Sequence, residues 1–279
     1  MGIISIFLAV VNTALLIRNF EKGLTFYLIM VFLAPNINFI GQAISYEIFF
    51  FPVLVILFLL FMKARTIRFS RVVLLLFLYF ILLLFSTFLS INLYNCDVSW
   101  VPIIGVFRII FLLLIITQFG TINTKLIRNV LVTVLTVNCI FAFIQLSNPS
   151  SAVFFASAYG KESQVPLLAM AKMGYFSRAV GSFGSPVNLG AFALLCFAYF
   201  LGLLLDRNRN LPNILGLCMA FICGILSCTK TFILGVPILV LLGIMFFVFI
   251  SKKEIKAPSF KTIKYVLIIM FLLVFMGPW

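Results

Sequence analysis

Long apolar runs recur along the whole chain, and they restrict its fold more strongly than any other feature of the sequence. Most runs contain close to 20 residues, and an α-helix of that length crosses about 30 Å of hydrocarbon. Hydrophobic residues make up 65% of the chain and charged residues 9%, which leaves too little polar surface to cover a soluble domain. The sequence therefore predicts an all-α fold, a polytopic bundle of transmembrane helices.

Hydropathy predicts about ten spans within a single integral membrane domain, 1–279. They are expected near 2–17, 24–42, 47–62, 72–91, 101–119, 129–147, 188–205, 212–228, 231–250 and 265–277. The second run is interrupted by "APNIN" and could be a re-entrant or kinked segment. The first could be an uncleaved signal anchor, but it lacks a basic n-region and a small-residue cleavage site, so we interpret it as a span.

The basic residues follow the positive-inside rule. Most of the 20 Lys and Arg residues fall in every second connection, for example at 63–71 and 252–264. This distribution predicts that those connections are cytoplasmic and that the N-terminus is extracytoplasmic. The formal net charge of +14 thus marks topology and contact with anionic lipid, and it does not indicate nucleic-acid binding.

Missing residue types exclude several mechanisms. The chain has no histidine, so a Ser-His-Asp triad, a His-ligated zinc site and a histidine base are excluded within these residues. The six acidic residues avoid the middle of the expected spans, which disfavours an ion-coupled transporter. No phosphate-binding Gly-Lys motif occurs in the cytoplasmic connections, which excludes a nucleotide-driven pump. We expect no metal and no cofactor, and we interpret the cysteines as small apolar core residues.

The longest expected connection, 148–187, lies on the extracytoplasmic side. Loops of such length in compact proteins are usually functional or disordered. Its segment "VPLLAMAKMGYFS" (165–177) is apolar with a single lysine. That composition is typical either of a short helix in the membrane interface or of a packing element over the bundle.

The loop closes with "RAVGSFGSPVNLGAF", residues 178–192. Ser185-Pro186 predicts a helix start, with serine as the N-cap and proline at the first helical position. Gly181 and Gly184 allow a tight turn or a close approach to a ligand. Arg178 adds a permanent cation, which together with the positive end of the helix dipole makes a candidate phosphate or pyrophosphate site. A capped helix preceded by an interfacial arginine would give a similar pattern.

Two further cations are expected in the outer half of the membrane. Arg108 lies about 10 Å deep in the expected span 101–119, where it must snorkel, face a polar interior or bind a ligand. Lys230 lies in "LSCTKTFIL", a short extracytoplasmic turn whose serine and threonine residues could cap the next helix. Cations from three separate parts of the chain at one face indicate an anionic ligand there.

The two motifs "RAVGSFGSPVNLGAF" and "LSCTKTFILGVPILVLL" together resemble the paired signatures of the O-antigen polymerase and O-antigen ligase superfamily. The family pattern is an arginine, a glycine-rich turn that opens a helix, and later a serine-rich turn with an arginine and a small residue. Arg178 matches the first arginine, and 181–188 matches the turn. Lys230 stands where the second motif usually has arginine, which keeps the charge but loses the bidentate fork. Thr231 conforms to the small position.

The resemblance implies a metal-independent membrane glycosyltransferase of the bacterial inner membrane. Its reaction would polymerise undecaprenyl-pyrophosphate-linked oligosaccharide repeat units into O-antigen or capsular polysaccharide at the extracytoplasmic face. Arg178 and Lys230 would act on the pyrophosphate as catalytic cations, and Arg108 would support them. Gly181, Gly184, Ser185 and Asn188 would shape the substrate site. The partners expected are the lipid-linked glycan, membrane lipids, a chain-length regulator and a flippase.

Other functions remain open at the level of the sequence. An O-antigen ligase would carry the same motifs, and we favour a polymerase because such genes are numerous, divergent and rich in phenylalanine and isoleucine. A polysaccharide flippase or other transporter should line a cavity with cations along its depth, whereas only Arg108 is expected inside a span. A non-catalytic scaffold is a further alternative. In the family a large extracytoplasmic loop follows the next spans, so we expect this chain, which stops at "MGPW", to be a C-terminally truncated member without its general base.

Overall fold

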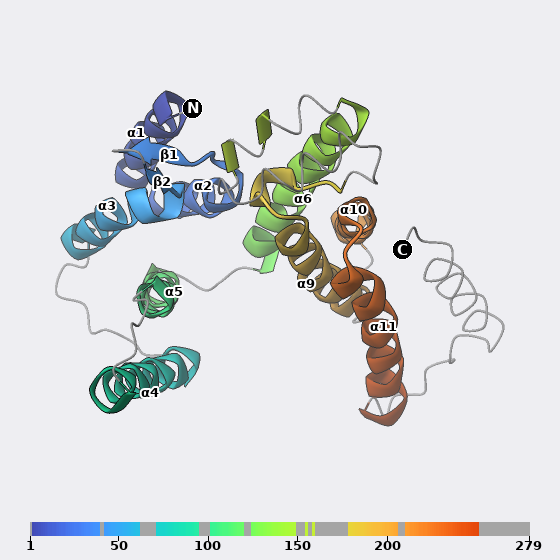
Figure 1. Cartoon of the computed structure of the whole chain (residues 1–279). Coiled ribbons are helices and arrows are strands. Elements are labelled where there is room, and N and C mark those ends of the chain that lie inside the picture. Colours follow the sequence, from blue (N-terminus) through green and yellow to red (C-terminus); the bar gives the residue numbers. More distant parts are fainter. Residues whose placement is uncertain are drawn as a thin grey trace. The chain divides into compact units, whose positions relative to one another are not determined.

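In the computed structural model, the residues that can be described are largely helical and include a short β-hairpin (Figure 1). The described residues are 2–39, 42–61, 71–94, 101–119, 124–148, 154–155, 158–159, 178–205 and 210–250. The expected span 265–277 and the expected interfacial segment 165–177 lie outside the described residues.

The described helices follow the expected apolar runs closely, with one exception discussed below. The elements are α1 (Gly2–Arg18), α2 (Phe20–Leu33), β1 (Ile37–Phe39), β2 (Gln42–Ile44), α3 (Tyr46–Phe61), α4 (Arg71–Tyr94), α5 (Val101–Phe119), α6 (Thr124–Ser147), the 3-10 turn η2 (Gly181–Phe183), α9 (Pro186–Leu205), α10 (Leu211–Ser227) and α11 (Lys230–Ile250). Helices α4, α6 and α9 are long and apolar enough to cross a membrane. Shorter apolar helical stretches lie at Ile3–Arg18, Tyr46–Leu60, Ile103–Thr117, Leu211–Ser227 and Lys230–Gly243. The helical fold class is confirmed, and a bundle of ten spans stays a prediction.

The exception is the run 24–42, which is not one continuous helix. Helix α2 ends at Leu33, and β1 pairs with β2 in antiparallel register, with Ile37 opposite Ile44. Pro35 has no N–H to donate and disfavours helical geometry in the residue before it, which favours a helix end just before it. The prediction of a full span over 24–42 is therefore wrong beyond Leu33, and the interruption expected at "APNIN" is confirmed.

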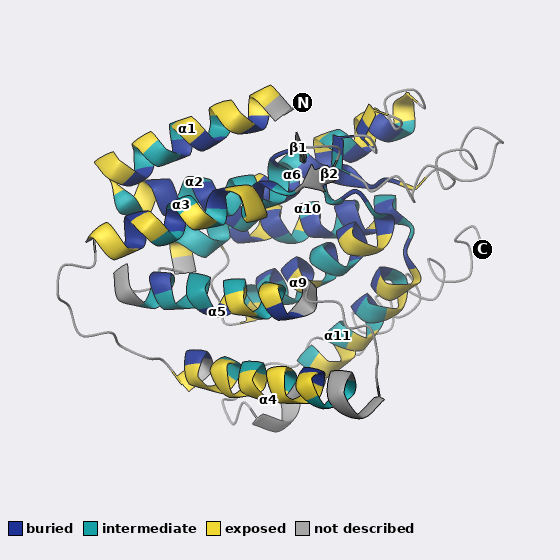
Figure 2. Ribbon diagram, turned by 60° about the vertical axis from the view of Figure 1, so that its left-hand side comes forward, coloured by how far each residue is buried: buried dark blue, intermediate teal, exposed yellow. Residues whose placement is uncertain are grey.

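Contacts divide the chain into two compact units, which are described separately. Unit 1 contains 1–8, 26–46 and 128–279, and unit 2 contains 9–25 and 47–127. In unit 2, α4 packs against α5, and the rings of Phe51 and Phe111 meet edge to face with their centroids 5.6 Å apart. Much of α4 faces outward with large apolar side chains (Figure 2), which is the surface that a lipid-facing helix requires.

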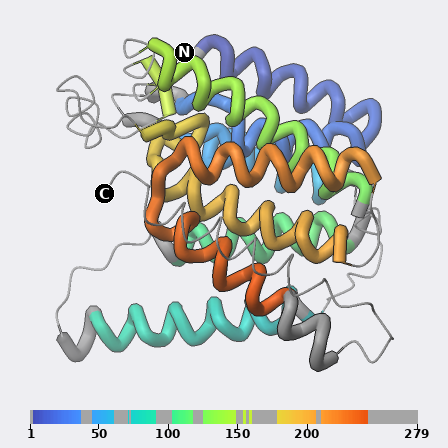
Figure 3. The backbone as a smooth tube through the Cα atoms, turned by 90° about the vertical axis from the view of Figure 1, so that its right-hand side faces the viewer, coloured from blue at the N-terminus to red at the C-terminus, as the bar shows by residue number. Residues whose placement is uncertain are grey.

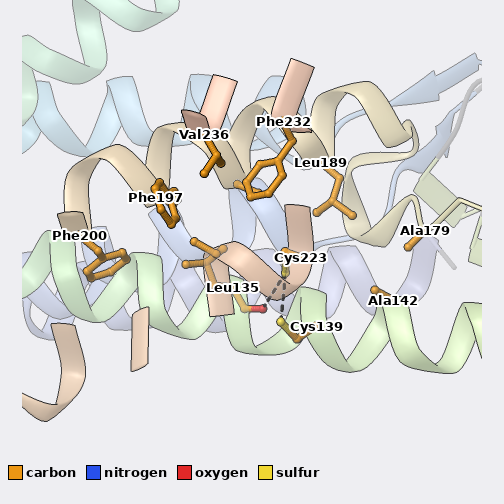
Figure 4. Packing of buried hydrophobic residues seen from close by; sticks show 13 residues of the cluster. Leu135, Cys139, Ala142, Ala179, Leu189, Phe197, Phe200, Cys223, Phe232 and Val236 are labelled. Carbon is orange, nitrogen blue, oxygen red and sulfur yellow. Dashed lines mark hydrogen bonds between the residues drawn. The ribbon is translucent and has the colours of Figure 1, made fainter. Parts of the chain in front are cut away.

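The core of unit 1 is built from α6, α9, α10 and α11. Helices α9 and α10 run alongside each other, and α11 packs against α9 at an angle (Figure 3). Buried side chains from all four helices form one cluster that includes Leu135, Leu189, Phe200 and Phe232 (Figure 4). Close packing depends on Gly224 of α10, because a Cβ there would collide with the Phe232 ring.

The cysteines lie largely where the sequence places them. Cys139, Cys196 and Cys223 are buried members of the unit 1 cluster, which confirms their interpretation as core residues. The sulfur atoms of Cys139 on α6 and Cys223 on α10 are 3.2 Å apart (Figure 4). Cys218 differs, because its side chain is exposed on the surface of α10.

Candidate functional site

The segment 178–188 forms a tight turn followed directly by α9. Gly181 has φ 55° and Gly184 has φ 65°, both in the left-handed region that glycine adopts readily. Helix α9 begins at Pro186, and the Ser185 carbonyl accepts a hydrogen bond from the N–H of Leu189 at 3.1 Å. That bond is the one an N-cap carbonyl makes, so the expected turn and the expected helix start are both confirmed.

Two amide side chains of α6 hold this turn. Gln145 Oε1 accepts the backbone N–H groups of Val180 at 2.9 Å and of Gly181 at 3.1 Å. Asn138 Oδ1 accepts the backbone N–H of Ser182 at 2.8 Å. Sequence reasoning missed both amides, although two buried-type amides seven residues apart on one face of an apolar helix are a signal of a functional or packing site.

The other side of the segment joins the connection between α10 and α11. The N–H of Ala179 donates to the Leu226 carbonyl at 3.0 Å, which fixes Arg178 beside the last turn of α10. Cys228 follows that turn with φ 46°. Burial raises the pKa of the Cys228 thiol, and the positive charge of Arg178 lowers it by a smaller amount. The Arg178 side chain therefore interacts electrostatically with the end of α10.

Lys230 belongs to the same connection, since it is the first residue of α11. The Thr229 carbonyl accepts the N–H of Ile233 at 3.0 Å, so Thr229 is the residue that precedes and opens α11. The structure therefore brings Arg178 and Lys230 to one connection, and both side chains are exposed.

The first turn of α9 packs against this connection as well. A Cβ at Gly190 would collide with the hydroxyls of Thr229 and Ser227, which shows how closely the two backbones approach. Asn188 is exposed in the same first turn of α9. The N-termini of α9 and α11, each the positive end of a helix dipole, thus lie side by side.

The C-terminus of α10 also lies here, and several of its last carbonyl groups accept hydrogen bonds from nearby residues of the protein. The Leu226 carbonyl accepts from Ala179, and the Ile225 carbonyl accepts the N–H of Cys228 at 2.9 Å. The Gly224 carbonyl accepts the Ser227 hydroxyl at 2.7 Å. Because these carbonyls have donors, they oppose an approaching anion less than an uncapped helix end would.

Arg108 is described by itself, because it belongs to unit 2. Its Nη1 atom lies 3.6 Å from Glu47 Oε2, and the arginine side chain is only 14% exposed. A carboxylate at that distance offsets part of the cost of a mostly buried guanidinium. The structure therefore gives Arg108 a counter-charge, and its expected role in support of Arg178 and Lys230 stays a prediction.

Comparison with known proteins adds no relative: no family model, no curated protein and no solved structure matches this chain. Within the residues that the structure describes, no group of three His, Cys, Asp or Glu side chains comes together to hold a metal. The apolar helices indicate a helical membrane protein. Its candidate site is the basic end of unit 1, formed by 178–190 and 226–230.

Proposed function

We propose that the basic end of unit 1 binds the pyrophosphate of an undecaprenyl-pyrophosphate-linked oligosaccharide and that the protein polymerises such repeat units into O-antigen or capsular polysaccharide. One observation carries the proposal: Arg178 and Lys230, which are far apart in the sequence, lie exposed at one connection beside the start of α9. This arrangement also supports the resemblance to the O-antigen polymerase and ligase superfamily, whose two motifs supply these two cations.

The chemistry of the site suits a pyrophosphate. Arginine and lysine side chains bind phosphate oxygens through charge-assisted hydrogen bonds. The first N–H groups of α9, at Val187 and Asn188, have no acceptor within the helix, and such groups commonly bind anions. In glycosyl transfer the lipid pyrophosphate is the leaving group, so cations that bind its developing charge lower the barrier.

The helix ends that meet here support a site on the extracytoplasmic side of the membrane. Ser5 near the start of α1 donates to the Pro35 carbonyl at 2.7 Å, and the Ser182 hydroxyl contacts the Phe32 carbonyl at the end of α2. The C-terminal part of α6 joins them through Gln145. The positive-inside rule assigns all of these ends to the extracytoplasmic face, which supports a site at the outer leaflet of the bacterial inner membrane.

The first test is lipid binding, because it does not require turnover. The purified full chain in detergent is titrated with undecaprenyl pyrophosphate, and undecaprenol serves as the uncharged control ligand. Arg178→Ala and Lys230→Ala should each weaken binding about tenfold, the value of one charge-assisted hydrogen bond. Arg18→Ala and Lys22→Ala remove exposed cations of the same kinds elsewhere and should leave binding unchanged. If all four variants bind undecaprenyl pyrophosphate with the affinity of the parent chain, the proposed site is refuted.

The second test separates the reactions. In proteoliposomes with lipid-linked repeat units, a polymerase yields longer lipid-linked chains, a ligase requires a separate acceptor, and a flippase moves the substrate without extending it. Chain growth that depends on Arg178 would support the proposal. Transfer only to an added acceptor, or translocation alone, would replace it with the corresponding alternative.

A further inference from the structure

Residues 178–180, the described residues that precede η2, have no regular secondary structure, so contacts with other elements hold them in place. One is the backbone bond from Ala179 to Leu226, and Gln145 makes three more. Its Oε1 accepts two adjacent backbone N–H groups, those of Val180 and Gly181, and its Nε2 donates to the Gly181 carbonyl at 3.3 Å. A glutamine amide offers both an acceptor and donors, and here it satisfies both kinds of backbone group.

Asn138 fixes the next residue in the same way. Its Oδ1 accepts the Ser182 N–H and lies 3.0 Å from the Ser182 hydroxyl, while its Nδ2 donates to the Val134 carbonyl of its own helix at 2.9 Å. A Cβ at residue 181 would collide with that Oδ1 atom, so this close approach requires Gly181.

Burial makes these two amides costly unless they are bonded. Asn138 is 0% exposed and Gln145 is 3% exposed. A buried amide without partners destabilises an apolar helix by several kcal/mol in a nonpolar medium, so polar groups persist there only when their bonds are made. In this structure those bonds go to 180–182, which directs the backbone N–H groups of the turn towards α6. Arg178, two residues earlier, is left exposed on the side of the α10–α11 connection.

We propose that Asn138 and Gln145 are positioning residues for Arg178: they anchor 180–182 so that the guanidinium stays beside Lys230 for the pyrophosphate. This inference rests on the proposed function of the basic end of unit 1. It assigns the two amides no contact with the ligand, because their polar atoms are occupied by the backbone.

A positioning role differs from a merely structural one in its coupling to Arg178. If Gln145 acts by holding Arg178 in place, the loss of Gln145 should remove the contribution of Arg178 and leave that of Lys230 largely intact. A general loss of packing would instead weaken both contributions alike. A double-mutant cycle measures this difference directly.

The experiment uses the full chain in detergent with undecaprenyl pyrophosphate as the probe. Gln145→Met keeps the volume of the side chain and suits an apolar helix. In this background Arg178→Ala should weaken binding no more than about twofold, against about tenfold in the parent chain, whereas Lys230→Ala should still cost about tenfold. Thr136→Val, on the same helix, removes a hydroxyl that bonds only its own helix at Val132, and it should leave both values unchanged.

Each outcome decides a different point. If Arg178→Ala costs tenfold in both backgrounds, the positioning role is refuted and the proposed site stands. If Arg178→Ala has no effect in the parent chain, the proposed function fails first. Thermal melting reports whether Gln145→Met is folded, and Asn138→Leu takes its place in the cycle if it is not. If neither variant folds, the two amides are required for folding itself, and the proposal that they position Arg178 is contradicted.

Discussion

Replacing Gly190 by alanine should destabilise unit 1, whereas the same replacement at Gly202 should not. Both glycines lie on α9, so the gain in helix propensity, about 0.8–1.0 kcal/mol in a helix interior, is similar for the two. At Gly202 an added Cβ meets no atom within 4 Å. At Gly190 it would collide with the hydroxyls of Thr229 and Ser227, which belong to the connection that opens α11.

The magnitude follows from the difference between the two sites. Overpacking of a close-packed interface costs about 1–3 kcal/mol, so Gly190→Ala should be less stable than Gly202→Ala by about that amount. The propensity term cancels in this comparison. Unfolding of the purified variants in mixed micelles, as the fraction of sodium dodecyl sulfate is raised, measures the difference. If Gly190→Ala is as stable as Gly202→Ala, the close approach of α9 to the α10–α11 connection is not the constraint we infer.

Two further predictions concern single contacts. Glu47→Gln removes the counter-charge of Arg108 and should lower the stability of the protein. The loss should be smaller than the roughly 3–5 kcal/mol of a fully buried pair, because the Glu47 side chain is 32% exposed. An unchanged micelle unfolding curve would show that the pair contributes nothing. Tyr159 donates its hydroxyl to the Leu33 carbonyl, and burial raises the pKa of Tyr159. Its contribution to the free energy of unfolding should therefore be complete below the ordinary tyrosine pKa of about 10 and disappear as the pH rises through the folded-state pKa. Tyr159→Phe should cost about 1 kcal/mol at neutral pH and flatten that dependence, and a pH profile identical to that of the parent would contradict this.

The local features of the site could be predicted because each depends on neighbouring residues. Proline at a first helical position and glycine at positive φ are properties of the backbone itself, so Ser185-Pro186, Gly181 and Gly184 predicted the turn and the start of α9 correctly. The expected level of Arg178 and Lys230 in the membrane came from counting spans and loops, and it stays a prediction. The structure places both residues beside one connection.

The features that were missed depend on distant partners. Hydropathy averages over a window, so it continued a span through Pro35 and gave no weight to Asn138 and Gln145 inside an apolar run. The importance of these amides appears only when 180–182 is seen against α6. Arg108 is similar: its depth was clear from its position, but its pairing with Glu47 of α3 depends on which helices are neighbours.

The hydrogen bonds around 178–182 have a consequence for the order in which the protein matures. Gln145 lies 35 residues before Val180 in the chain, and the Phe32 carbonyl lies 150 residues before Ser182. Ala179 must also wait for Leu226, which is synthesised later. Contacts between residues so distant in sequence form slowly, because loop closure precedes any gain from them. The proposed anion site is therefore expected to be among the last parts of unit 1 to assemble, because it requires α10. A chain still emerging from the ribosome would present its apolar helices before this site had formed.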